Sequence, residues 1–274
     1  MFSSIFISIA FIEFILSFNT NINPTIVERN IRLKEYTPLM EKYLIPSDNF
    51  LAKTENLIQK EYKFKLDEDG YIYPSEIHKN PDLKIIFLGG STTQCGCVEE
   101  KNRFPFLVGR MLEKANKIKV NSYNSWVGGN HTLHSIDILI YNVLRINPDV
   151  MVMMHKLNDL NTLLYEKTCW NDSPSRSLPV KENRIQPYKH ITLKNIVYRL
   201  MPRIYTRLYY LKKSFNEVDE FAHLRGKKLN LDKNYILESF GENLDAYIKI
   251  AKSYGITPVL MTQANRLKEN PIHL

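Results

Sequence analysis

The run from Lys84 to Thr93 constrains this chain more than any other stretch. Residues 84–88 are almost wholly apolar, which is typical of a strand buried on both faces of a parallel sheet. Two glycines end the strand and permit a tight turn with close backbone approach, and Ser91 follows them. A side chain at this place lies at the carboxyl edge of the sheet, where open α/β folds bind their ligands. Ser91 is therefore a candidate nucleophile, and the alternative is that it only caps the next segment.

Downstream of this run, strand and helix patterns alternate. Strands are predicted over 84–88, 119–123, 149–154 and 256–262, and helices over 104–116, 132–146 and 235–254. Such alternation predicts an α/β fold, a three-layer αβα sandwich whose parallel sheet is covered by helices on both faces. At 274 residues, the chain fits one such domain with an insertion better than it fits two domains.

The other stretches divide the chain into segments. Residues 1–20 form a hydrophobic segment, 21–80 a membrane-proximal region, and 81–274 the α/β domain with an insertion at about 167–232. A hairpin is predicted over 64–74, where an Asp-Gly turn joins two short alternating strands. The insertion has aromatic and arginine residues at helical spacing, which indicates either a lid or membrane-facing helix or a helix packed on the core.

Residues 2–18 hold one charged side chain, Glu13, in a run rich in Ile and Phe. This is about the minimum length for crossing a bilayer. No small-residue cleavage site follows, so a single-pass, uncleaved membrane anchor is predicted, and the alternative is an amphipathic helix docked on the domain. Arg29, Arg32 and Lys34 lie downstream and favour a cytoplasmic domain by the positive-inside rule, while the side of the membrane stays open.

Composition argues against several other classes of function. The net charge of +8 is spread along the chain, and no basic block is interleaved with base-stacking aromatic residues, so no nucleic-acid partner is expected. The three cysteines, Cys95, Cys97 and Cys169, are an odd number without the spacing of zinc ligands. This pattern favours unpaired thiols, and neither a metal nor a cofactor is expected.

Two further loops leave the carboxyl ends of predicted strands. Residues 124–132 follow the second strand and contain Gly129, and residues 155–159 follow the third and contain Asn158. Because parallel strands bring such loops to one edge of the sheet, we expect Ser91, Gly129 and Asn158 to converge there. Acyl transfer needs a nucleophile together with hydrogen-bond donors aimed at the oxyanion of the tetrahedral intermediate. The glycine N–H and the asparagine amide are the predicted donors.

The three loops resemble the sequence blocks of the SGNH (GDSL-type) hydrolase family, which bring a Ser, a Gly, an Asn and a His into one site. Residues 89–93 are similar to the first block, 124–129 to the second, and Asn158-Asp159 to the third. The resemblance covers roughly residues 83–166 and 235–265. It implies a flavodoxin-like fold and a serine esterase without a cofactor, acting on small-molecule or glycan esters such as O-acylated carbohydrate or lipid-like substrates.

Several positions depart from the family pattern. Gly90 stands where many members have Asp, Trp126 where a first glycine is common, and Lys156 in place of the usual glycine. The family's fourth block, Asp-x-x-His, supplies the base, but here Asn270 stands three residues before His273. The simplest interpretation is a chain that stops before its catalytic His, and weak or no activity is then expected.

Other histidines are alternative bases: His131, His134, His155 and His273. A base must reach hydrogen-bond distance of Ser91 while an acceptor holds its second nitrogen. Asp159 is expected to cap a helix or support a loop rather than act as an acid. Two other functions stay open. One is a non-catalytic acyl-sugar binding or scaffold protein on the same fold, and the other is a phosphate cradle at residues 89–93, which lacks the lysine of a P-loop.

Overall fold

The computed structural model describes residues 8, 11, 28–31, 33–52, 54–169, 171, 176, 180–183 and 232–263. The predicted membrane anchor, most of the predicted insertion and the C-terminal residues with His273 lie outside these ranges, although Ser8 and Phe11 are helical. Within the described part of the chain, no helix has the length and apolar character needed to cross a membrane.

By its contacts the chain divides into two units, Met1–Ile31 with Val180–Lys228, and Arg32–Pro179 with Leu229–Leu274. In the first unit, strand β1 (Glu28–Ile31) pairs antiparallel with β7 (Val180–Asn183). The other strands and the helices whose bounds are given below belong to the second unit.

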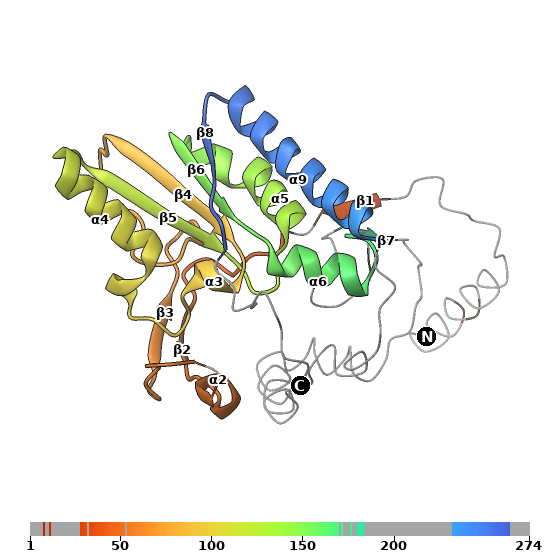
Figure 1. Ribbon diagram of the computed structural model, residues 1–274, viewed down its shortest axis with the longest axis horizontal. Coiled ribbons are helices and arrows are strands. Elements are labelled where there is room, and N and C mark those ends of the chain that lie inside the picture. Colours follow the sequence, from red (N-terminus) through yellow and green to blue (C-terminus); the bar gives the residue numbers. More distant parts are fainter. Residues whose placement is uncertain are drawn as a thin grey trace. The chain divides into compact units, whose positions relative to one another are not determined.

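The second unit is built on a parallel four-stranded sheet (Figure 1). Its strands are β4 (Leu83–Gly89), β5 (Val120–Trp126), β6 (Val150–Met154) and β8 (Thr257–Leu260), in the order β5-β4-β6-β8. This is the order of a doubly wound sheet, in which successive crossovers run in opposite directions from the first strand. The predicted α/β class with a parallel sheet is therefore confirmed.

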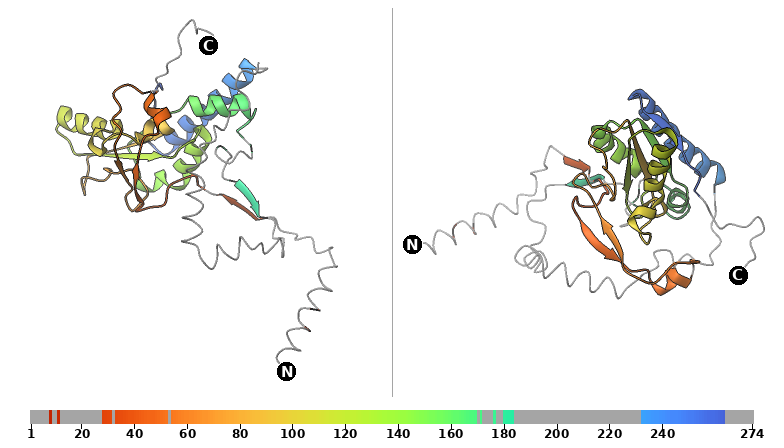
Figure 2. Two further views of the ribbon diagram at one scale, coloured as in Figure 1. Left: turned by 90° about the horizontal axis from the view of Figure 1, so that it is seen from below. Right: turned by 90° about the vertical axis from the view of Figure 1, so that its left-hand side faces the viewer.

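Helices cover both faces of the sheet (Figure 2). On one face, α4 (Phe104–Asn116) packs on Ile85 and Phe87 of β4. On the other face, α5 (Thr132–Tyr141) and α9 (Lys233–Ser253) pack on the intervening residues of the same strand. The apolar run of β4 has no polar face because successive side chains alternate between two buried layers.

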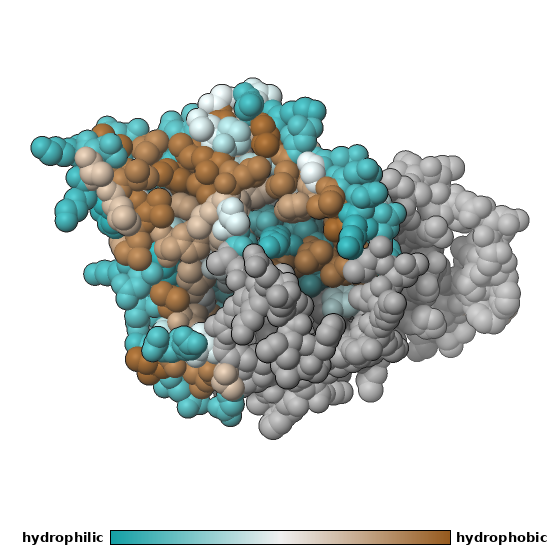
Figure 3. All heavy atoms as spheres, viewed as in Figure 1, coloured by the Kyte–Doolittle hydropathy of each residue, from teal (hydrophilic) through white to brown (hydrophobic). Residues whose placement is uncertain are grey.

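The α4 face is only partly covered. Val259 of β8 lies in register with Val152 of β6, so the two side chains point to the same face, and Val259 is exposed. In the view of Figure 3, apolar side chains gather over the sheet between α4 and β8. Leu107 and Met111, on the flank of α4, are also exposed.

Two predicted elements differ from the structure. The helix expected over 132–146 ends as an α-helix at Tyr141 and continues as a 3₁₀ turn, η2 (Val143–Ile146). The backbone of Asn142 leaves helical geometry, with φ −124° and ψ −53°, and Pro148 follows soon after, so the last turn tightens. The second strand is longer than predicted, because Asn124 and Ser125 still pair with β4.

The predicted hairpin forms only in part. Its first strand, β3 (Tyr62–Lys65), pairs with the upstream strand β2 (Glu41–Leu44). The short helix α2 (Asp48–Ala52) lies between β2 and β3 in the chain. The expected pairing forms as one bridge, between Leu66 and Ile72. It is flanked by hydrogen bonds from the N–H of Asp67 to the carbonyl of Tyr71 and from the N–H of Tyr73 to the carbonyl of Lys65, both 2.9 Å. The N–H of Ile72 donates to the carbonyl of Asn124 (3.0 Å), so the turn lies at the edge of β5.

All three cysteines are described, and all are unpaired, as predicted. Cys169 is buried, and burial raises the pKa of its thiol to about 12. The pKa values of Cys95 and Cys97 are also raised by burial. These thiols are therefore poor nucleophiles at neutral pH.

Gly89 and Gly241 provide a first prediction. A Cβ at Gly89 would lie 2.9 Å from the carbonyl oxygen of Met154 and 2.0 Å from Oγ1 of Thr93, so Gly89→Ala is expected to lower the free energy of unfolding by about 1–3 kcal/mol. Gly241, inside α9, has nothing within 4 Å of its Cβ position, and Gly241→Ala is expected to raise it by about 0.5–1 kcal/mol. Urea unfolding measures both values, and destabilisation by both variants would contradict this account of α9.

Candidate active site

Three strands of the sheet end at the same level. Gly89 of β4 is in register with Trp126 of β5 on one side and with Met154 of β6 on the other. The loops that follow these strands therefore begin side by side at the carboxyl edge of the sheet. Ser91 opens the short helix α3 (Ser91–Gln94) directly after β4, and its side chain is exposed.

Asn158 lies directly over Gly90. Its side-chain Nδ2 donates to the carbonyl oxygen of Asn130 at 2.7 Å. A Cβ at Gly90 would lie 2.5 Å from Nδ2 of Asn158 and 3.4 Å from the Asn130 carbonyl oxygen. The residue before Ser91, the amide of Asn158 and the residue after Gly129 thus meet at one point. The Asn158 amide leaves no room for a side chain at position 90.

Gly129 has a φ of +74°, a left-handed conformation that glycine adopts without the steric cost that a Cβ imposes. It lies in a tight turn in which the N–H of Asn130 donates to the carbonyl of Val127 at 3.2 Å. This turn brings the Asn130 carbonyl to the amide of Asn158. The requirement for glycine here is therefore one of backbone geometry.

Arg176 orients the amide of Asn158. Its Nη1 lies 3.4 Å from the side-chain Oδ1 of Asn158 and 3.4 Å from the backbone carbonyl of the same residue. Because the guanidinium faces Oδ1, the NH₂ group points to Asn130. An Asn amide has two donor hydrogens, and the bond to Asn130 uses one of them.

Gln263 joins three elements at this edge of the sheet. It follows β8, its Oε1 accepts from the N–H of Leu157 (3.1 Å), and its Nε2 donates to Oγ1 of Thr92 (2.6 Å). Leu157 begins helix α6 (Leu157–Tyr165), which also carries Asn158. The end of β8 is therefore tied both to the segment of Ser91 and to the segment of Asn158.

His155 is buried in a network of its own. Its Nε2 lies 2.7 Å from Oγ of Ser135, and its Nδ1 lies 3.9 Å from Oδ2 of Asp159. These residues have the composition of a catalytic triad, but Ser135 is only 1% exposed, so no substrate reaches it. Oδ1 of Asp159 accepts from the N–H of Thr132 (2.9 Å) at the start of α5. Asp159 thus supports the neighbouring helix, one of the two structural roles predicted for it.

His131 and His134 are buried together, with ring centroids 3.9 Å apart. The backbone N–H of His131 donates to Nδ1 of His134 (3.3 Å), and Nε2 of His131 donates to the carbonyl of Arg176 (3.2 Å). Burial lowers the pKa of His131 to about 2 and that of His155 to about 3. Three of the four alternative bases are therefore buried and engaged in the core, and His273 lies outside the described residues.

No group of three or more His, Cys, Asp or Glu side chains that could hold a metal occurs within the described ranges.

The burial of Asp159 predicts a pH dependence of stability. Burial raises the pKa of its carboxyl from the ordinary 3.8 to about 6. The folded state therefore favours the protonated form, and stability present below about pH 4 is lost as the pH rises through 6. Asp159→Asn removes this loss. The free energy of unfolding of the variant, measured relative to wild type, is therefore expected to rise by about 2–2.5 kcal/mol between about pH 4 and pH 7.

Urea unfolding of both proteins across this range measures the difference. The buried histidines have depressed pKa values and destabilise the fold as the pH falls, but both proteins retain them, so their contribution cancels in the difference. A difference that does not change with pH would contradict a raised pKa for Asp159.

No protein-family model matches this chain, and no curated protein matches it. Solved structures that are similar include a putative lipolytic protein of the G-D-S-L family from Desulfitobacterium hafniense, with 13% identity and a TM-score of 0.31 over 65% of this chain. The chain spans 58% of the length of that structure.

In two other similar structures, the match with this chain covers a larger share of the other protein. Axe2, an acetylxylan esterase from Geobacillus stearothermophilus, has 14% identity and a TM-score of 0.31, over 65% of this chain and 76% of that one. A putative GDSL-like lipase from Parabacteroides merdae has 15% identity and a TM-score of 0.30, over 66% and 78%. The descriptions of the lipolytic protein and of the lipase name the GDSL type that the sequence blocks resemble, and the assignment of roles below rests on the residues of this chain.

Sequence reasoning missed three residues of this site. Asn130 follows the predicted Gly129, and Gln263 follows a predicted strand, so the rule that strand ends converge could have found both. Arg176 lies in the predicted insertion, and no local pattern connects it with Asn158, from which it is separated by 18 residues.

Proposed function

We propose that this chain is a serine ester hydrolase of the SGNH type, in which Ser91 attacks the acyl carbonyl of the substrate. The N–H of Gly129 and the second hydrogen on Nδ2 of Asn158 are the donors for the oxyanion. The observation that carries the proposal is the contact of Gly90 with both Asn158 and the Asn130 carbonyl. It brings the residue before the nucleophile, the amide donor and the glycine loop to one place.

The reaction runs in two steps. The Ser91 hydroxyl adds to the carbonyl carbon and gives its proton to solvent water. The tetrahedral intermediate then collapses to an acyl-enzyme, and the leaving oxygen takes a proton from solvent and departs as the alcohol. Water hydrolyses the acyl-enzyme in the second step. Because His131, His134 and His155 are buried and engaged in the core, none of these three imidazoles is expected to take the proton from Ser91, and slow turnover is expected.

A reactive thiol at position 91 tests the geometry without a base. Ser91→Cys is expected to be acylated by p-nitrophenyl acetate in a burst of one p-nitrophenolate per chain at mildly alkaline pH, because a thiolate needs no general base. Thr92→Cys is the matched control, since both side chains are exposed in the same turn but only position 91 is proposed to face the donors. Mass spectrometry locates the acetyl group.

Wild-type protein gives the background rate of acylation at Cys95, Cys97 and Cys169. This rate is expected to be low because the pKa values of these thiols are raised. Equal acylation of the two variants, at the rate of a free thiol, would contradict the proposed role of position 91. Rapid turnover of the wild type that Ser91→Ala abolishes would show that a histidine outside the described residues, such as His273, acts as the base.

A second function uses the same site without chemistry. The burial of His131, His134 and His155 favours a protein that binds an acylated sugar and does not hydrolyse it. Saturable binding of an acetylated xylo-oligosaccharide, with no acylation of the Ser91→Cys variant, would support this alternative.

We also propose that the apolar segment 2–18 anchors the chain to a membrane, since its length is about the minimum for a span. Retention of the full chain in alkali-washed membranes, and its loss when this segment is deleted, are the expected results. Release of the full chain by alkali would contradict the proposal.

A further inference from the structure

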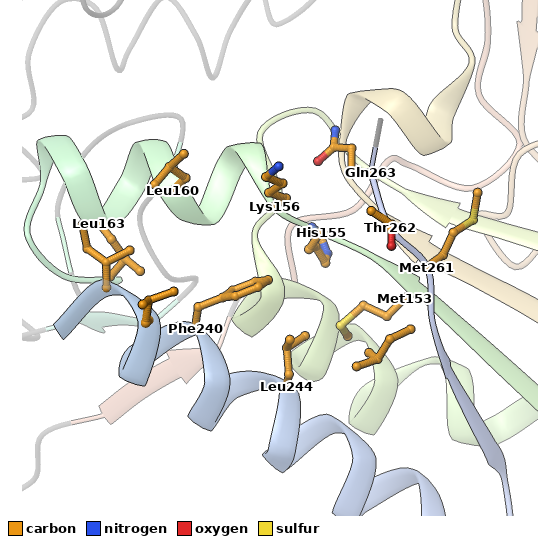
Figure 4. A pocket seen from close by; sticks show the side chains of 13 residues that line it. Met153, His155, Lys156, Leu160, Leu163, Phe240, Leu244, Met261, Thr262 and Gln263 are labelled. Carbon is orange, nitrogen blue, oxygen red and sulfur yellow. The ribbon is translucent and has the colours of Figure 1, made fainter. Parts of the chain in front are cut away.

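An apolar groove of about 450 Å³ lies between α6 and α9 at the carboxyl ends of β6 and β8. Figure 4 shows that side chains from these two helices and strands face the same space. The apolar lining includes Met153, Leu160, Leu163, Phe240, Leu244 and Leu260. Its volume falls within the range of small-molecule sites, roughly 300–1,000 Å³.

The groove leaves apolar surface open to solvent. Leu260 pairs in register with Met153, so both side chains point to the α9 side of the sheet. Met153 is buried there, whereas Leu260 is 48% exposed. Leu237, on the α9 wall, is 69% exposed. Concave, exposed apolar surface of this kind is typical of a ligand site.

One end of the groove is polar and adjoins the candidate active site. His155, Lys156 and Gln263 line this end. Gln263 donates to Oγ1 of Thr92, the residue after Ser91, and accepts from the N–H of Leu157, the residue before Asn158. The same side chain therefore lines the groove and holds the segments of the nucleophile and of the amide donor.

We propose that this groove binds the aliphatic acyl chain of the ester that Ser91 attacks, so that medium-chain esters are better substrates than acetyl esters. The inference rests on the proposed function. An acetyl group is too small to occupy a groove of this size, whereas a longer chain buries one further methylene per carbon. Each buried methylene is expected to increase the acylation rate constant about fourfold until the groove is full.

The acylation rate of Ser91→Cys by p-nitrophenyl acetate, butanoate and octanoate measures this preference. From butanoate to octanoate the second-order rate constant is expected to rise by a factor on the order of 10². Leu237→Glu places a carboxylate on the groove wall and is expected to lower the octanoate rate at least about tenfold, leaving the acetate rate within about twofold. Met111→Glu is the matched control, because Met111 is also 69% exposed on a helix but does not line the groove.

Calorimetric titration of wild-type protein with octanoate tests the groove without any chemistry. Binding that Leu237→Glu weakens at least about tenfold, and that Met111→Glu leaves unchanged, is expected. Acetate and octanoate esters that react at equal rates, or loss of preference in the Met111→Glu control, would overturn the acyl-chain assignment while leaving Ser91 as nucleophile. Octanoate binding in the groove without acylation of any ester would instead overturn the proposed function and, with it, the role of the groove as an acyl subsite.

Discussion

Asn158→Ala is expected to slow acylation of the Ser91→Cys variant by p-nitrophenyl acetate by a factor of about 10²–10³. The amide of Asn158 has one hydrogen on the Asn130 carbonyl (2.7 Å) and one left for the oxyanion. Removing the side chain removes a donor that strengthens as negative charge develops on the substrate oxygen, so the loss falls on the rate of reaction and little on binding.

Asn161→Ala provides the matched control. Asn161 lies in α6, three residues after Asn158, and is neither fully buried nor fully exposed, so the same substitution there tests for general effects on the helix. Its acylation rate is expected to stay within about twofold of the parent. An Asn158→Ala rate within the same range, in a protein that unfolds at the same urea concentration, would exclude Asn158 as an oxyanion donor.

Gly90→Ala is expected to cause a loss of acylation comparable to that of Asn158→Ala. The added Cβ would lie 2.5 Å from Nδ2 of Asn158, closer than real Cβ atoms approach, so the amide must move away from the site. Gly128→Ala is the control in the neighbouring loop, because its Cβ would make only an ordinary contact at 3.5 Å with the Trp126 ring.

A double-mutant cycle separates this mechanism from a general disturbance of the turn. If Gly90→Ala acts by displacing the amide, it has little further effect in a protein that already carries Asn158→Ala, so the two losses are strongly non-additive. Multiplication of the two rate losses in the double variant would show instead that Gly90 acts independently of Asn158.

Local patterns determined much of this protein. The apolar run at 84–88 predicted a strand buried on both faces, and the alternation that follows predicted a parallel sheet, because side-chain period and burial are set by near neighbours along the chain. The glycine at 129 and the polar residues after each strand marked the carboxyl edge. All three predicted site residues lie just beyond strands that end at this edge, Gly129 in a loop and Ser91 and Asn158 at the starts of helices, since parallel strands end on one side.

Tertiary packing decided the rest. The sequence pattern could not show that Asn158 lies over Gly90, that Arg176 orients its amide, or that three candidate histidines turn into the core, because each of these depends on residues distant in sequence. The pairing of β3 with β2, in addition to the short predicted hairpin, has the same origin. An edge strand pairs with the neighbour that buries its apolar face, and that choice is made by the assembled core and not by the strand's own residues.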